Sequence, residues 1–163
     1  MMSGKIKAGK GGLIGNAGGF YVMAELLKNG VIAGLTPRNA RAFDILATKD
    51  NKTVKIRVKT KSQEFLNWQW MAKKDKSIFR DLSDIDDFTI LVDLAYDLAK
   101  ISFYIIKSIK LDGWLKKDYE DWVVAPEKKG QPHNPETRKR NLNSIKYKDK
   151  IESYKNNWDV LWG

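Results

Sequence analysis

The sequence has no cysteine and one histidine, His133, and these two scarcities exclude whole classes of chemistry. Disulfide bonds, thiolate zinc sites and cysteine nucleophiles are excluded, and so is a metal site built from several histidines. No apolar run approaches the roughly 18 residues needed to cross a bilayer. The first residues also lack the apolar core of a signal peptide. We therefore expect a cytoplasmic protein with no membrane partner.

The chain has the length and apolar content of one folded domain. It has 163 residues, of which 42% are hydrophobic, and it contains six Trp, six Tyr and six Phe. This composition supports a single sizeable core and argues against disorder over most of the length. Residues 1–14 are rich in Gly and Lys, so we expect a flexible basic N-terminal arm there. A single domain should follow over residues 15–163.

Positive charge dominates the sequence and is unevenly distributed. The formal net charge is +10, and residues 49–61 hold six Lys or Arg against one Asp. Such a basic field is the electrostatic footprint expected for a protein that binds a phosphate backbone, because neutralising phosphates releases condensed counterions. Surplus lysine that only keeps the protein in solution is the alternative interpretation.

Two neighbouring runs, residues 42–47 and 53–60, predict a β-hairpin joined by the turn 49–52. Both runs are rich in apolar and β-branched residues, which is typical of strands. The simplest antiparallel register places Asp44 opposite Arg57. Because side chains alternate along a strand, one face should carry Val54, Ile56 and Val58. The polar face should then carry Asp44 together with three cations: Lys55, Arg57 and Lys59.

The remaining pattern predicts further helices and strands. A helix should run from about residue 17 to 29, capped by Asn16 and ended by Gly30, with Phe20, Ala24 and Leu27 on one apolar stripe. Residues 88–94 are apolar on nearly every position, as in a central strand, and a second strand over 101–106 should lie beside it. Helices over 112–121 and 149–162, and an exposed loop over 126–140, complete the pattern. We therefore expect an α/β fold, a central mixed β-sheet flanked by helices.

The order and spacing of these motifs resemble small members of the restriction-endonuclease-like PD-(D/E)XK nuclease superfamily. The similarity covers roughly residues 15–125 and rests on Gly15–Gly18, Tyr21-Val22, Glu25–Leu27, Asp44–Leu46, Val58–Thr60, Trp68–Met71 and Phe88–Leu94. The resemblance implies a Mg²⁺ site held by a strand aspartate, by an acidic or amide residue two before a lysine, and often by a helix glutamate. Asp44 and Lys59 match the aspartate and the lysine. They are therefore the candidate catalytic residues, with Asp44 as the metal ligand.

The sequence departs from the family pattern at two positions. Arg57 stands where the second metal ligand belongs, and Gly19 stands where many relatives place the helix glutamate. A guanidinium offers donors and no acceptor, so Arg57 cannot coordinate Mg²⁺. We expect Arg57 to pair with Asp44 across the strands and to take the place of the metal. An exposed ion pair without function is the alternative. If a metal is kept, Gln63 or Asp93 could complete its site.

These residues predict a nucleic-acid-binding domain, with DNA favoured over RNA and with weak or lost Mg²⁺-dependent phosphodiester hydrolysis. The candidate nucleic-acid-binding residues are Lys10, Lys55, Arg57, Lys59 and Lys61. An active metal-dependent deoxyribonuclease with a rearranged ligand set is the alternative. A structural or protein-interaction domain is a further alternative, and homodimer formation is left open.

Overall fold

The computed structural model describes residues 11–37, 42–82, 85–127 and 130–163. Most of the expected N-terminal arm, including Lys10, therefore lies outside the described residues. In chain order the elements are α1 (Gly11–Lys28), β1 (Ile32–Leu35), β2 (Ile45–Lys49), β3 (Lys52–Ser62), β4 (Asn67–Met71), β5 (Asp87–Leu94), η1 (Leu98–Lys100), β6 (Ser102–Lys107), α2 (Ser108–Val124), β7 (Lys139–Asn143), α3 (Lys148–Glu152) and η2 (Trp158–Leu161).

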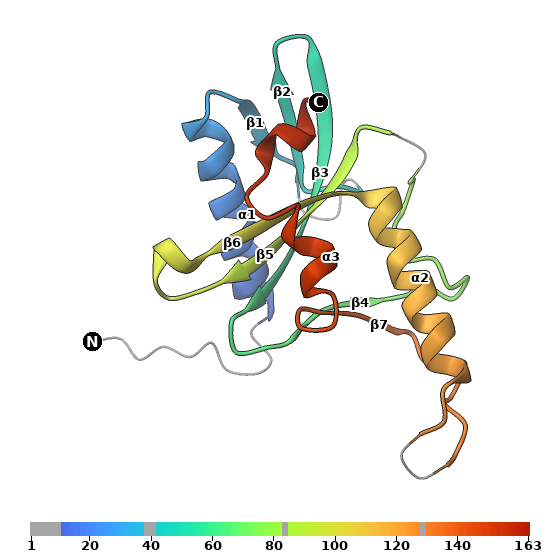
Figure 1. Cartoon of the computed structure of the whole chain (residues 1–163). Helices are drawn as coiled ribbons and strands as arrows, with labels where there is room; N and C mark the ends of the chain where they lie inside the picture. Colours follow the sequence, from blue (N-terminus) through green and yellow to red (C-terminus); the bar gives the residue numbers. More distant parts are fainter. Residues whose placement is uncertain (1–10, 38–41, 83–84, 128–129) are drawn as a thin grey trace.

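A five-stranded sheet in the order β1-β2-β3-β5-β6 forms the centre of the fold (Figure 1). Strands β3 and β5 run parallel to each other, whereas the other neighbours are antiparallel. Helix α1 packs on one face of the sheet, and α2 packs on the other together with a separate two-stranded ribbon, β4–β7. The predicted α/β architecture with a mixed sheet flanked by helices is confirmed. No helix in the described part of the chain is both long and apolar enough to cross a membrane.

Both faces of the sheet are buried, which explains the continuous apolar run of β5. On the α1 side, Ile56 of β3 and Phe88 of β5 are partners in the ladder and are fully buried, and Val54, Ile90 and Val92 join them as predicted. Val58 packs against this cluster and is partly buried. On the other side, Trp68 and Leu142 of the ribbon bury Leu91 against α2. A strand that is covered on both faces needs apolar side chains at odd and even positions alike.

The hairpin has the predicted register throughout β2, and it departs from this register at one residue, Asp44. Ile45 pairs with Ile56 and Ala47 with Val54. At Asp44 the ladder shifts, because its amide also donates to the carbonyl of Ile56, at 2.9 Å. Asp44, directly before β2, and Ile45 therefore both oppose Ile56 of β3, which is the arrangement of a β-bulge. A bulge turns a side chain away from its regular direction, and this decides where the Asp44 carboxylate lies.

Helix α1 differs from the prediction at its start and in its buried face. It begins at Gly11, so residues 11–14 belong to the helix and not to an arm, and Asn16 lies within it and is not its cap. It ends as predicted, with Gly30 at φ +75° and the amide of Val31 donating to the carbonyl of Leu26, the hydrogen bond of a Schellman motif.

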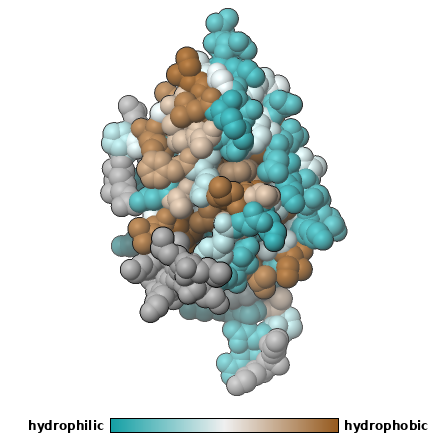
Figure 2. Space-filling model, turned by 90° about the vertical axis from the view of Figure 1, so that its left-hand side faces the viewer, coloured by the Kyte–Doolittle hydropathy of each residue, from teal (hydrophilic) through white to brown (hydrophobic). Residues whose placement is uncertain are grey.

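The side of α1 that faces the sheet is lined by Gly18, Gly19, Val22 and Leu26. Phe20 and Leu27 of the predicted stripe are 62% and 54% exposed. Helix α1 lies on the side of the molecule that faces the viewer in Figure 2, and hydrophobic side chains gather on that side. A Cβ atom on Gly18 would lie 1.8 Å from the hydroxyl oxygen of Thr60, so the helix can approach β3 only with glycine at this position.

The C-terminal third also differs from the prediction. Helix α2 is longer than the predicted 112–121, and β7 begins inside the predicted loop 126–140. The predicted helix over 149–162 is two short helices, α3 and η2. The break between them falls near Asn156, whose backbone and side chain bond to Phe103 of β6. These contacts with the sheet replace the helical hydrogen bonds that the spacing of apolar residues predicted.

Candidate functional site

A cleft of about 880 Å³ opens between α1 and the segment that follows β4. Helix α1 lines it with small or polar residues, among them Gly15, Asn16 and Gly19. The sheet contributes Asp44, Arg57 and Val58, and the opposite wall contributes Lys73, Ile78 and Arg80. Among the described residues that line this cleft, Asp44 is the one acid, whereas Arg57, Lys73 and Arg80 are cations. The cleft therefore has a positive wall around a single carboxylate.

Asp44 is exposed in this cleft, and its carboxylate points to the α1 side of the sheet. Its Oδ2 atom accepts a hydrogen bond from the amide of Val58 at 2.7 Å. Both residues line the cleft with the glycine face of α1. The bulge turns Asp44 away from the regular alternation of side chains. The predicted polar face of Asp44, Arg57 and Lys59, which assumes an ideal ladder, therefore does not form.

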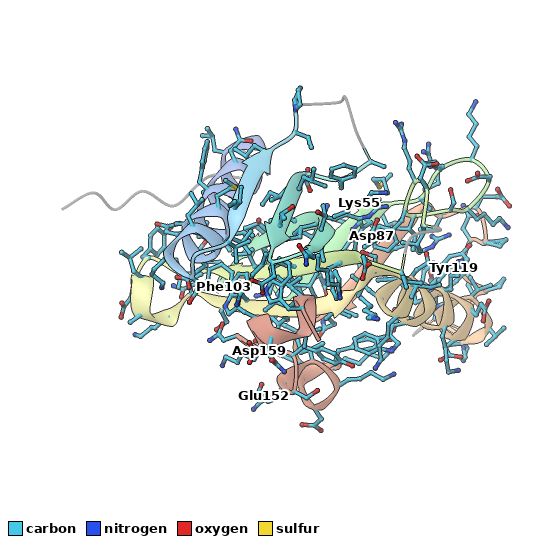
Figure 3. The ribbon with its side chains drawn as sticks, turned by 90° about the horizontal axis from the view of Figure 1, so that it is seen from above. Lys55, Asp87, Phe103, Tyr119, Glu152 and Asp159 are labelled. Carbon is cyan, nitrogen blue, oxygen red and sulfur yellow. The ribbon has the colours of Figure 1, made fainter. Side chains whose placement is uncertain are left out.

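The predicted pairing of Arg57 with Asp44 is wrong, because Arg57 is held by Asp87. The guanidinium forms a bidentate pair with Asp87, with Nε–Oδ1 and Nη2–Oδ2 distances of 2.8 and 2.7 Å. Two further donors reach the carbonyl oxygens of Ala42 and Arg80, at 2.7 and 2.6 Å. Asp87 begins β5 beside Lys55 of β3 (Figure 3). Arg57 therefore joins two strands and two loops, and it does not stand in for a metal at Asp44.

Lys59 is the predicted site residue that remains coupled to Asp44. Its amine lies 5.4 Å from the centre of the Trp70 ring. Burial lowers the pKa of Lys59 below its usual 10.5, and the negative charge of Asp44 acts in the opposite direction. Desolvation disfavours the charged form of an amine, whereas a nearby carboxylate favours it. Lys59 is thus partly withdrawn from water, and the charge of Asp44 acts on its amine.

The other predicted ligands and phosphate contacts lie away from this cleft. Lys61 is 5% exposed, and its amine pairs with Asp93 at 2.7 Å and lies over the Trp68 ring. Asp93 is paired in the sheet with Lys61, four residues beyond Arg57, which corresponds to about 13 Å along the strand. Gln63 directly follows β3, still further from Asp44 along the chain, and its backbone amide donates to the carbonyl of Leu94. Neither Gln63 nor Asp93 is brought to Asp44, and Lys61 does not offer its charge to a ligand.

Lys55 keeps a half-buried position on β3, with its amine 5.8 Å from the centre of the Phe43 ring. Phe43 lines the cleft next to Asp44, so Lys55 lies near its edge. Lys55 remains a candidate for phosphate contact.

The residues around Asp44 do not fit a metal ion held by the protein alone. In the described ranges there is no group of three His, Cys, Asp or Glu side chains that could hold a metal. Asp44 supplies one carboxylate, and one of its oxygens already accepts the Val58 amide. Mg²⁺ prefers an octahedral set of oxygen ligands, usually with one or two carboxylates.

Sequence reasoning missed the opposite wall of the cleft and the partner of Arg57. Lys73 and Arg80 lie in the segment between β4 and β5, which holds four Asp and four Lys or Arg. The charge of a segment does not show which side chains line a cleft. Asp87, directly before the apolar run of β5, offered a signal, because a carboxylate at the start of a buried strand needs a buried partner.

Comparison with known proteins gives similarity at the level of structure alone. No protein-family model and no curated protein matches this sequence. Among solved structures, the chain is similar to that of a bacterial homing endonuclease, I-Ssp6803I, with a TM-score of 0.49 and 13% sequence identity. The similarity covers 95% of this chain and 93% of that chain.

Proposed function

We propose that this chain binds duplex DNA through the cleft around Asp44. The observation that carries the proposal is the charge of the cleft, where Lys73 and Arg80 form one wall opposite the single carboxylate of Asp44. A phosphate backbone is the polyanion that such a wall complements, and the net charge of +10 adds attraction at longer range. A site for a cationic ligand would need an excess of carboxylates, and this cleft has the opposite balance.

We further propose that Mg²⁺-dependent hydrolysis is weak or lost. The PD-(D/E)XK pattern needs two or three oxygen ligands, and the described residues supply the carboxylate of Asp44 alone. Arg57, at the position of the second ligand, is bound to Asp87 and cannot turn into a metal ligand. Positive charge can hold the scissile phosphate, but it does not generate the nucleophile that hydrolysis requires.

An active endonuclease is the second candidate, and one observation favours it. Because Asp87 holds Arg57, the Asp44 carboxylate is not neutralised by that guanidinium. The charge of Asp44 also acts on Lys59, the other residue that the nuclease resemblance implies to be catalytic. A protein-interaction domain is a further candidate, favoured by the exposed apolar side chains on α1 and β1, Phe20, Leu27, Ile32 and Leu35, which a second copy of the chain could cover.

Salt-dependent binding to a labelled duplex tests the proposal. If about five phosphates are neutralised, the affinity should fall about 10³-fold between 50 and 200 mM salt. Lys73→Ala and Arg80→Ala should each weaken binding and reduce the slope of log K against log salt by about one. Lys28→Ala removes one exposed charge at the far end of α1 and serves as the matched control. A flat salt response of the parent would refute the proposal.

Nicking of supercoiled plasmid separates binding from hydrolysis. With Mg²⁺ or Mn²⁺, we expect the parent to nick slowly or not at all while it still binds the plasmid. Rapid metal-dependent nicking that Asp44→Ala abolishes would instead establish the active endonuclease. Asp44→Ala should leave duplex affinity unchanged or slightly higher, because it removes a negative charge from a phosphate-binding cleft.

A further inference from the structure

The β4–β7 ribbon has two faces of different chemistry. The register pairs Trp68 with Leu142 and Trp70 with Arg140 on one face. On the other face it pairs Asn67 with Asn143, Gln69 with Asn141 and Met71 with Lys139. Side chains of residues paired across a ladder share a face, and successive residues alternate. One face is therefore aromatic and apolar, and the other, here called the amide face, carries four carboxamides.

The aromatic face anchors the ribbon to the rest of the protein. Trp68 is fully buried, and its indole nitrogen donates to the carbonyl of Val92 in the central sheet at 3.0 Å. Arg140 is 5% exposed and lies over the ring of Tyr119, which is labelled on α2 in Figure 3. These contacts fix the ribbon against both the sheet and α2. The β4 side of the amide face, with the exposed Asn67 and Gln69, is consequently presented outward by a rigid support, whereas the side-chain oxygen of Asn141 is buried.

Folding does not explain the composition of the amide face. Asn is depleted in strands because its side chain competes for backbone hydrogen bonds. Asn143 has a local role, since its side-chain oxygen accepts from the amides of Ile145 and Lys146. Asn67 and Gln69 are exposed, and they lie one above the other on the same face of β4. Two such exposed carboxamides on one strand of the ribbon are suited to contacts outside the protein.

The amide face continues into positive charge at one end. Beyond Met71 and Lys139, a small basic cavity of about 210 Å³ is lined by Lys73, Lys74, Lys76 and Arg138. Glu136 also lines this cavity. The nearby Asp75 carboxylate accepts hydrogen bonds from the backbone amide and the hydroxyl of Ser77. Met71 and Lys73 line the Asp44 cleft as well. Amide face, basic cavity and cleft thus form one continuous surface.

We infer that the β4–β7 ribbon enters the major groove of duplex DNA, where Asn67 and Gln69 determine specificity by binding adenine. This inference rests on the proposed function and names the contacts that would make binding selective. The major groove of B-DNA admits a two-stranded β-ribbon, and the carboxamides of Asn and Gln form bidentate hydrogen bonds with the N6 and N7 atoms of adenine. The basic cavity would hold phosphates beside the groove. Phosphate contacts position a protein, whereas base contacts specify the sequence.

The geometry also sets the spacing of the bases that are bound. Residues i and i+2 of a strand lie about 6.6 Å apart. Successive base pairs rise by about 3.4 Å, so Asn67 and Gln69 should contact bases about two steps apart. The major groove of A-form RNA is deep and too narrow for side chains to reach its bases. The ribbon therefore fits DNA as its partner and not an RNA duplex.

Selection from a pool of random duplexes, followed by measured affinities, tests this inference. The parent should select adenines two steps apart and bind the selected duplex about 100-fold more tightly than a scrambled one, since each bidentate contact contributes about 10-fold. Asn67→Ala and Gln69→Ala should each lower this ratio about 10-fold at their own position, while affinity for the scrambled duplex and the salt slope stay as in the parent. Gln131→Ala, an exposed glutamine outside the ribbon, is the matched control and should change neither quantity.

Lys74→Ala is the contrasting variant, since it should weaken binding to both duplexes equally and lower the salt slope. If the parent binds duplexes but selects no sequence, or keeps its selectivity in Asn67→Ala with Gln69→Ala, the ribbon inference is wrong while the proposed function stands. If the parent binds no duplex at any salt concentration, both fail. Equal selectivity for the matching RNA duplex would also overturn the major-groove contact.

Discussion

Removal of either partner of the Arg57–Asp87 pair is expected to destabilise the fold far more than removal of an exposed ion pair. The two residues are 7% and 2% exposed, and the pair is bidentate. Asp87→Ala leaves the guanidinium buried with no carboxylate. Arg57→Met leaves the carboxylate buried and also removes the donors that reach the carbonyls of Ala42 and Arg80.

The expected magnitude follows from the cost of an unpaired buried charge. Breaking a buried pair by removing one partner costs about 3–5 kcal/mol, against a total stability of about 5–15 kcal/mol for a typical domain. For a chain of this length, that loss lowers the melting temperature by about 10 °C. The double variant Arg57→Met with Asp87→Ala removes both charges, and it should be more stable than either single variant. This non-additivity identifies the buried charge as the cause.

Urea unfolding followed by tryptophan fluorescence measures the four free energies of this cycle. Asp121→Ala supplies the matched control, because its pair with Lys117 is exposed and should contribute less than about 1 kcal/mol. The reasoning would be refuted if Asp87→Ala cost no more than this control, or if the double variant lost the sum of the two single losses. Either result would mean that the pair is solvated in solution.

Three further predictions concern the cleft and the helix that covers it. Burial lowers the pKa of Lys59 in the folded chain, so its charge destabilises the fold at neutral pH, and this cost disappears as the pH rises through the lowered pKa towards 10.5. Lys59→Met should therefore melt higher than the parent at pH 7 and lose this advantage near pH 10; an equal melting temperature at pH 7 would contradict this expectation. Gly18→Ala should destabilise by about 1–3 kcal/mol, since its Cβ would strike Thr60, whereas Gly15→Ala, which meets nothing within 4 Å, should be neutral or stabilising in urea unfolding. Gly19→Glu, at an open position that lines the cleft, should add a second carboxylate near Asp44 and give a Mn²⁺-dependent rise in melting temperature that the parent lacks; no such rise would mean that the two carboxylates do not converge.

The hairpin and the central strands could be predicted because each carries its own signal. Alternation along Val54, Ile56 and Val58 fixes the buried face, and the two-residue turn at Asp50 and Asn51 fixes the register. The apolar run of β5 marks a strand covered on both faces. Local patterns of this kind depend on period and turn chemistry, which are present in the sequence itself.

The arrangement of the site could not be predicted, because it depends on departures from those patterns. The bulge at Asp44 changes the direction of one carboxylate, which accepts the Val58 amide, and an ideal ladder does not contain it. The buried side of α1 is its glycine side, so the hydrophobic stripe around Phe20 pointed to the wrong face. The partner of Arg57 comes from a strand thirty residues later in the chain. No spacing rule connects residues that meet only when the sheet assembles.

The bond between Arg57 and Asp87 also limits how this protein could change over evolutionary time. A nuclease-like ligand at position 57 would require an acid there, yet a single substitution of Arg57 by Glu would place two carboxylates together in a buried site. Changing Asp87 first would leave the arginine unpaired. Each single step passes through a destabilised protein, so a metal ligand at position 57 is accessible only through two coordinated substitutions. A single substitution of Gly19 by Glu meets no steric obstacle, because a Cβ atom there has no neighbour within 4 Å. A metal ligand should therefore be gained in this cleft first on helix α1.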